Sequence, residues 1–403
     1  MDVTAVLLAA NTAGSTRKEA EAIIENAKLA DFGGFMRLLA AELKDGSKPL
    51  GSRQMAGTRR RRGGGAAAAR RRRGRWRSAF CVSCAPPRVA ARARARGGRC
   101  AGCAVAADGA ARLAPRARLT DAPPPGLLMK GALTSNDEML LEEREGAWKA
   151  LPEPVRNEVK ASLVDALSCG EPVARHTAAQ AIARIGGIEV PAGEWPLLIH
   201  GLLNLWGAES LGLKHTSLEA LGYLCEELGP DDVNAETTNM ILTAIIAGLG
   251  TELPVEIRHV AAVALNNALV FARHNMDEEA ERTVIMDAIA TTTQCPSEEV
   301  RVAAFECITQ VAFLYYDILA PYLEGLKSVT FDAVRKGEEK VALLGLEFWC
   351  TVAEEERGRL DRIEEAKVRR VAAAARGSPC TCACGGVLAL LAAVAESDGA
   401  WCC

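Results

Sequence analysis

The sequence predicts an all-α fold in which amphipathic helices stack in pairs to form a superhelical solenoid. Of the 403 residues, 49% are hydrophobic but only 4% are aromatic, and Ala and Leu abound. This composition is typical of helices that pack through small side chains. From residue 152 to residue 356 a single plan also repeats: an amphipathic helix, a short turn and a second amphipathic helix.

Five helix pairs are expected in this stretch. In chain order they cover 152–170 with 171–190, 193–207 with 213–229, 237–250 with 255–273, 278–294 with 297–316, and 321–334 with 338–356. Gly and Pro separate the helices, as helix ends require. The second helices carry small apolar residues, as in HTAAQAIARI and HVAAVALNNAL. The period of about 40–45 residues is typical of HEAT or armadillo repeats.

The predicted domains follow from this pattern. Residues 1–57 form the first repeats, and residues 127–356 form the main HEAT solenoid, giving about seven helix pairs in all. Residues 58–126 interrupt the solenoid, and residues 357–403 form a divergent Cys/Ala-rich tail that we expect to be disordered.

The interrupting stretch has a composition unlike the rest of the chain. Residues 58–126 contain 18 Arg, no Lys, two Asp and no Glu, so they carry +16. Since the whole chain carries −3, the other residues carry −19. The stretch has almost no Leu, Ile or Val with which to form a core. We interpret it as a disordered, low-complexity insert that arises from a translated intron. GC-rich non-coding DNA, when translated, yields mainly residues such as Arg, Ala, Gly and Pro, because their codons are rich in G and C. A genuine disordered basic insertion and a zinc site stay open as alternatives.

The insert contains four cysteines with zinc-ribbon spacing. Two Cys-x2-Cys pairs, Cys81 with Cys84 and Cys100 with Cys103, are separated by fifteen residues. The hydrophobic residues and hairpin signals of zinc ribbons are missing around them, so no metal or other cofactor is predicted. The alternative function that this motif leaves open is a zinc- or arginine-dependent nucleic-acid-binding protein on a helical scaffold. The charge by itself predicts no specific nucleic-acid partner.

Several other classes of protein are disfavoured. The amino terminus lacks a basic region before its short apolar run, and no apolar run approaches the length of a membrane span, so a soluble intracellular protein without a membrane partner is expected. Five cysteines lie singly in helical patterns and are interpreted as core residues: Cys169, Cys225, Cys295, Cys307 and Cys350.

An enzyme is not predicted either. The five histidines lie singly on expected helices without a paired nucleophile: His176, His200, His215, His259 and His274. The run GGGAAAARRRRGR lacks the Gly-Lys-Ser/Thr ending of a phosphate-binding loop.

Several strings together resemble one family of helical solenoids. VPAGEWPLLI, TSLEALGYLCEEL, ILTAIIAGL, TQCPSEEVRVAAFECITQVAFLYYDILAPYL and VALLGLEFWCTVAEEE follow one another in the order found in the amino-terminal half of the importin-β (karyopherin-β) family. The likeness is strong over residues 127–356 and weaker over residues 1–57.

This resemblance implies a nuclear transport receptor that moves between cytoplasm and nucleus through the nuclear pore. The implied partners are FG-repeat nucleoporins, the Ran GTPase and basic protein cargo. The insert falls within the early repeats that would bind Ran. Importin-α is not an expected partner, because the family binds it through later repeats.

The resemblance also implies an FG-binding pocket between consecutive first helices. Matched position by position, its residues are Leu242, Thr243, Ile246, Glu281, Ile285 and Tyr322. Val284 stands where the family has phenylalanine, and the lost aromatic wall should weaken FG binding by about 1 kcal/mol.

Overall fold

The computed structural model describes residues 2–10, 15–57, 128–135 and 137–377, and every regular element in these ranges is helical. The predicted all-α class is therefore confirmed. The chain divides into two compact units, Met1–Ala132 and Leu133–Cys403. The basic insert and its four cysteines lie outside the described residues, as does the last part of the tail.

The first unit contains α1 (Val3–Ala10), α2 (Ser15–Ala30), α3 (Phe32–Lys44) and α4 (Leu50–Gly57). The Asp31 side chain caps α3 by accepting a 2.8 Å hydrogen bond from the Gly34 amide. The buried apolar side chains of this unit include Leu7, Ile24, Phe35, Met36, Leu39 and Leu43 from α1, α2 and α3. α4 reaches Gly57 and α8 (Leu128–Leu133) begins at Leu128, so the described helices border the insert on both sides.

The second unit consists of successive helix pairs, as expected. After α9 (Glu138–Lys149) the pairs are α10 (Glu153–Leu167) with α11 (Pro172–Glu189), α12 (Leu198–Trp206) with α13 (Leu211–Glu227), and α14 (Ala235–Gly248) with α15 (Val255–Ala268). They continue through α16 (Arg273–Asp277), α17 (Glu279–Thr293) with α18 (Glu298–Leu314), the short helices η1 (Tyr316–Ile318) and η2 (Ala320–Tyr322), and α19 (Leu323–Lys336) with α20 (Glu339–Gly377).

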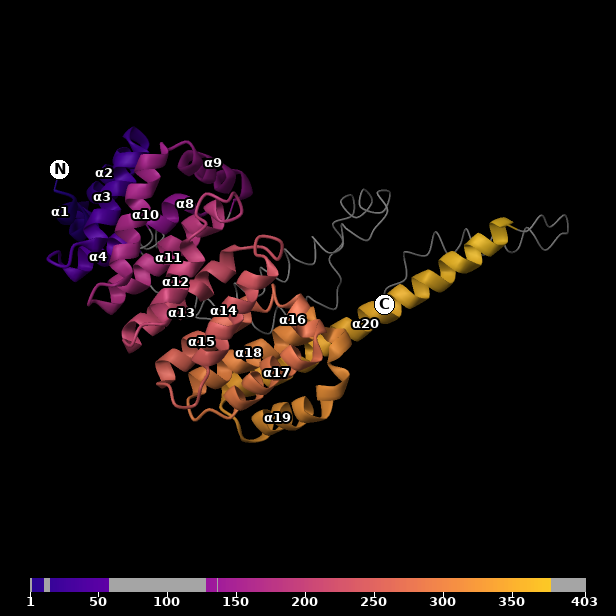
Figure 1. The fold of residues 1–403 in the computed structure, drawn as a ribbon. Coiled ribbons are helices and arrows are strands. Elements are labelled where there is room, and N and C mark those ends of the chain that lie inside the picture. The colour runs from indigo at the N-terminus through magenta and orange to yellow at the C-terminus, as the bar shows by residue number, and fades with distance from the viewer. Residues whose placement is uncertain (1, 11–14, 58–127, 136, 378–403) are drawn as a thin grey trace. The chain divides into compact units, whose positions relative to one another are not determined.

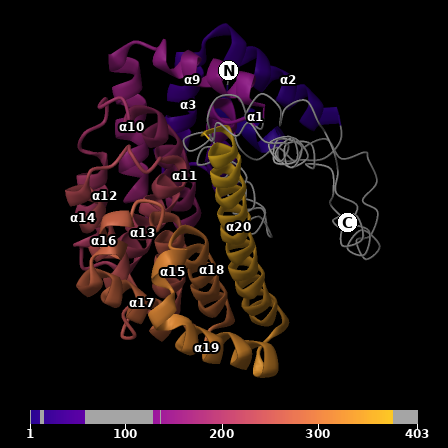
Figure 2. The same ribbon diagram turned by 90° about the vertical axis from the view of Figure 1, so that its right-hand side faces the viewer.

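The pairs form two layers. Figure 2 shows the first helices α10, α12, α14 and α17 along one side of this unit, and the second helices α11, α13, α15 and α18 beside them. Each second helix packs extensively on the next one, from α11 through α13, α15 and α18 to α20. The first helices touch one another much less; α12 and α14 share the most contact among them.

Small residues explain the close packing of the second layer. A Cβ atom added at Gly222 on α13 would lie only 3.0 Å from the Ala264 Cβ and 3.1 Å from the Ala264 Cα on α15. Asn267 on α15 donates a 2.9 Å hydrogen bond to the carbonyl of the same glycine. The predicted pattern of small apolar residues therefore lies at the interface between second helices.

This contact yields a stability prediction. Gly222→Val is expected to lower the free energy of unfolding by about 1–3 kcal/mol, because the new side chain would force the backbones of α13 and α15 apart. Chemical denaturation of the full chain measures the change. Gly201→Val on α12 is the matched control, because nothing lies within 4 Å of its added Cβ. An equal loss in both variants would mean that helix propensity alone, and not helix packing, sets the cost.

The cysteines of the helical body differ in exposure. Cys225, Cys295 and Cys307 are buried, which confirms their interpretation as core residues. Cys169 is only partly buried and Cys350 is exposed, so the core interpretation was wrong for Cys350. Burial raises the pKa of the Cys307 thiol, and its Sγ lies 3.4 Å from the Ala262 carbonyl oxygen on α15. This thiol is therefore a protonated packing group.

α20 extends beyond the expected end of the solenoid. We expected the ordered pattern to stop at residue 356, but α20 continues to Gly377, and its yellow end runs away from α18 and α19 in Figure 1. Arg359 accounts for the first part of the extension: it lies over the Tyr316 ring at 4.4 Å and pairs with Asp317 at 2.6 Å. Beyond it every residue from 361 to 370 is exposed, so helix-forming residues and local pairs such as Glu365–Arg369 sustain the helix.

Candidate protein-binding site

The six residues implied by the resemblance differ in accessibility. Leu242 on α14 and Ile285 on α17 are buried, at 3% and 2% exposure. Thr243 and Glu281 are exposed, and Ile246 and Tyr322 are half-buried. The side chains of Thr243, Ile246, Glu281 and Tyr322 are therefore accessible to a partner, whereas those of Leu242 and Ile285 are covered by the protein.

A hydrogen-bond chain connects two of the first helices. The Asn275 side chain on α16 donates at 2.6 Å to the Asn239 Oδ1 on α14 and at 2.6 Å to the Glu281 Oε2 on α17. Asn275 is buried, at 6% exposure. The structure thus links α14 and Glu281 through an asparagine that sequence analysis did not single out. Tyr322 lies further along the chain, at the end of η2.

The described part of the second unit contains a groove of about 710 Å³ between α12 and α14. Its apolar lining is Leu203, Trp206, Met240, Ala244 and Ala247, and its polar lining is Glu236, Asn239 and Thr243. Of the six implied residues, Thr243 alone lines this groove. The lining residues of α14 recur every three or four positions, so they form one stripe along the helix. Leu242 and Ile246 lie beside that stripe.

Trp206 is the aromatic wall of the groove. The Nζ of Lys214 on α13 lies 4.6 Å from the centre of the Trp206 ring and donates a 2.9 Å hydrogen bond to the Trp206 carbonyl. This cation therefore fixes the ring from the α13 side. Sequence analysis did not single out Trp206 as a site residue.

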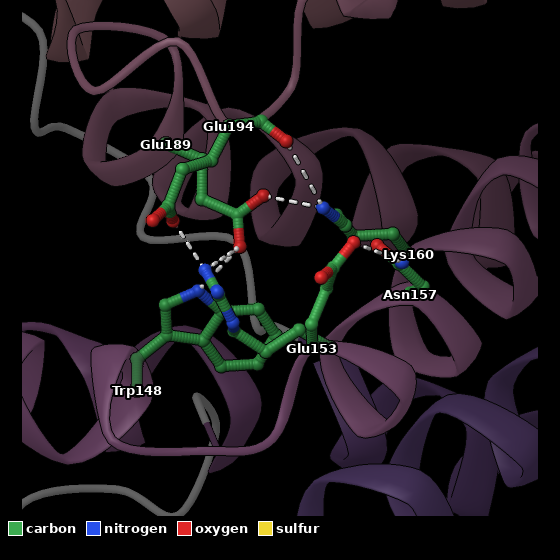
Figure 3. A network of polar contacts seen from close by, with 7 residues as sticks. Trp148, Glu153, Asn157, Lys160, Glu189 and Glu194 are labelled. Carbon is green, nitrogen blue, oxygen red and sulfur yellow. Dashed lines mark hydrogen bonds and ion pairs between the residues drawn. The ribbon is translucent and has the colours of Figure 1, made fainter.

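A separate cluster of charges is buried in the same unit (Figure 3). Glu189, which is fully buried, accepts 3.0 Å hydrogen bonds at Oε1 from Trp148 Nε1 and Arg156, and its Oε2 accepts a 2.6 Å hydrogen bond from Lys160. Arg156 also pairs with Glu194, which raises the pKa of its guanidinium. Both Glu189 oxygens are occupied, so this cluster joins α9, α10 and α11 and leaves no free acid or base.

His176 is held by polar side chains of α11 and α13. His176 has both ring nitrogens engaged: Nδ1 lies 2.6 Å from Glu219 Oε1, and Nε2 lies 3.0 Å from Gln180 Nε2. Within the described ranges, no group of three or more His, Cys, Asp or Glu side chains could hold a metal ion. No helix in the same ranges is long and apolar enough to cross a membrane.

Comparison with known proteins gives a consistent set of relatives. No family model matches the chain. It is 39% identical over 241 residues to importin subunit beta-1 of Arabidopsis thaliana, which covers 60% of this chain and 27% of that protein. It is 36% identical over 234 residues to importin subunit beta-1 of Schizosaccharomyces pombe, with 57% and 27% covered. The matched part is thus about a quarter of each relative's length.

Solved structures show the same likeness in the fold. Yeast importin-β (Kap95p) matches with a TM-score of 0.65 at 25% identity, over 91% of this chain and 36% of that one. Kap95 in a complex with Nup1 matches with a TM-score of 0.61 at 25% identity, over 95% of this chain and 36% of that one.

Proposed function

We propose a function for this chain from the premise that it corresponds to an amino-terminal portion of the importin-β family, as its sequence relatives and its HEAT-type fold indicate. The chain acts as a nuclear transport receptor that binds FG-repeat nucleoporins on its layer of first helices. It would work in the cytoplasm, in the nucleus and at the nuclear pore, and it is a binding protein without catalytic activity.

One observation carries this proposal: the first helices, unlike the second helices, leave accessible surface between them. Ile246 and Thr243 of α14 are at least partly exposed, and Glu281 of α17 is held near α14 through Asn275. A half-buried isoleucine beside polar acceptors suits a phenylalanine ring whose flanking backbone amides need acceptors. The complex of the related Kap95 with Nup1 supports the same class of partner.

Charge supports basic cargo as a second partner. The residues outside 58–126 carry −19, so the helical body attracts positively charged segments at long range. Ran is proposed as a third partner through the family likeness. The nucleic-acid-binding alternative rests on the insert, which lies outside the described residues, and no contact in the described ranges favours it.

Retention on immobilised FG repeats tests the proposal. The full chain should be retained, and Ile246→Asp should weaken binding about tenfold or more, because a charge would be desolvated against the phenylalanine ring. Val255→Asp is the control: this residue is 41% exposed and opens α15, where an acidic residue suits the helix terminus. Far-UV circular dichroism checks that both variants are folded. Equal retention of wild type and Ile246→Asp would contradict the assigned position.

A further inference from the structure

The groove between α12 and α14 has features that the proposed pocket lacks. Val284, at the position where the resemblance implies an aromatic wall, is an aliphatic residue with 54% exposure. The α12–α14 groove has an aromatic residue, Trp206, in its lining, together with Met240. Ala244 and Ala247 contribute only a methyl group each to the lining, which leaves room in the groove for a planar ring.

The chemistry of the lining defines the occupant. Aromatic rings and thioethers favour another aromatic ring at offset or edge-on geometry. Glu236 brings carboxylate oxygens to the lining, where they suit the amide N–H groups of an extended peptide, whereas the Asn239 Oδ1 already accepts a hydrogen bond from Asn275. Glu236 is also the one charged residue of the lining, so a peptide without acidic residues fits best. A phenylalanine followed by glycine meets these requirements, since glycine lets the peptide backbone approach closely.

The groove is continuous with the proposed binding surface. Thr243, one of the six implied residues, lines it, and Asn239 in its lining is hydrogen-bonded through Asn275 to Glu281. α12 and α14 lie next to each other in the layer of first helices (Figure 2). The two faces of α14 therefore belong to adjacent sites.

We propose that the groove between α12 and α14 is a second docking site for Phe-Gly segments, with Trp206 as its aromatic wall. This inference rests on the proposed function, because it takes the same class of partner. A nucleoporin chain with several Phe-Gly units can then occupy both faces of α14 together, which raises its effective affinity well above that of one unit.

Site-directed photo-crosslinking tests the inference. The probe is a synthetic peptide with one Phe-Gly unit flanked by Ser, Gly and Thr, in which benzoylphenylalanine replaces the phenylalanine. After irradiation with the full chain, mass spectrometry is expected to find attachment at Met240 or Leu203. Unlabelled peptide should compete for this attachment.

Two variants are expected to lower crosslinking at Met240 about tenfold. Trp206→Ala removes the aromatic wall. Ala247→Leu places a larger side chain in the groove. Because Ala247 is exposed, this change removes no packing, so it still tests the proposal if Trp206→Ala folds poorly. Leu197→Ala, at a residue that is 74% exposed and outside the lining, should leave the yield unchanged.

The outcomes separate this inference from the proposed function. Crosslinks found only around Ile246 and unchanged in Trp206→Ala would overturn the second site and leave the first. Crosslinks at Met240 that survive Ile246→Asp would support the second site alone. If the wild-type chain shows no competable crosslink, both proposals are wrong.

Discussion

Replacing Glu189 with alanine is expected to lower the free energy of unfolding by about 3–5 kcal/mol. The substitution removes the acceptor for three donors: the buried Trp148 indole and Lys160 ammonium, and the half-buried Arg156 guanidinium. Lys160, which is only 8% exposed, would then lose its carboxylate partner and lie close to the positive charge of Arg156, which keeps its ion pair with Glu194. Chemical denaturation of the full chain, followed by circular dichroism, measures the loss.

Two further variants make the Glu189 result specific. Glu153→Ala removes an exposed carboxylate on the neighbouring α10 and should change stability by less than about 0.5 kcal/mol. Adding Lys160→Met to Glu189→Ala should restore part of the lost stability, because one unpaired buried charge is gone. If the free energy of unfolding of Glu189→Ala lies within about 1 kcal/mol of the wild-type value, then the cluster contributes little to stability and water must reach it.

Phe305→Ala is expected to cost about 3–5 kcal/mol as well, by a different mechanism. Phe305 on α18 is 2% exposed and packs with Ala333 on α19 and Val341 on α20. Its removal would leave a cavity where the last two described helices meet the stack. Because each repeat contacts mainly its neighbours, the loss should be concentrated there.

Hydrogen exchange locates the effect of Phe305→Ala. Amides of α19 and of the first half of α20 should exchange faster, whereas those of α10 and α11 should be unchanged. Phe331→Ala is the control, because this side chain is 42% exposed and should cost much less. A uniform increase in exchange over the whole unit would show that the repeats unfold as one cooperative block.

The sequence was sufficient for the repeats, because the packing pattern is local. Small residues such as Ala264 and Gly222 recur at helical spacing in the second helix of each pair. This pattern therefore predicted both the helices and their close contact. The end of α20 was missed because residues 357–377 lack a packing pattern. Helix propensity and pairs such as Glu365–Arg369 extend the helix there without a partner layer.

The candidate site was less predictable, since it depends on how adjacent first helices are spaced. The resemblance implied residues on α14 and α17, but it could not separate the buried Leu242 from the exposed Thr243 one position away. The sequence could not identify Trp206 as a site residue, because a tryptophan in an apolar helix is equally typical of a core residue. Only the position of α12 beside α14 shows that this ring lines a groove.

The unequal packing of the two layers has a mechanical consequence. The second helices meet through backbone-close contacts such as Gly222 with Ala264, which resist both compression and separation. The first helices share little contact, so that layer is the more compliant one. When the stack bends, its neutral axis therefore lies near the second layer, and strain is largest among the first helices. A small change of curvature then alters the width of the α12–α14 groove, so a load applied elsewhere on the solenoid would change the space between these two helices.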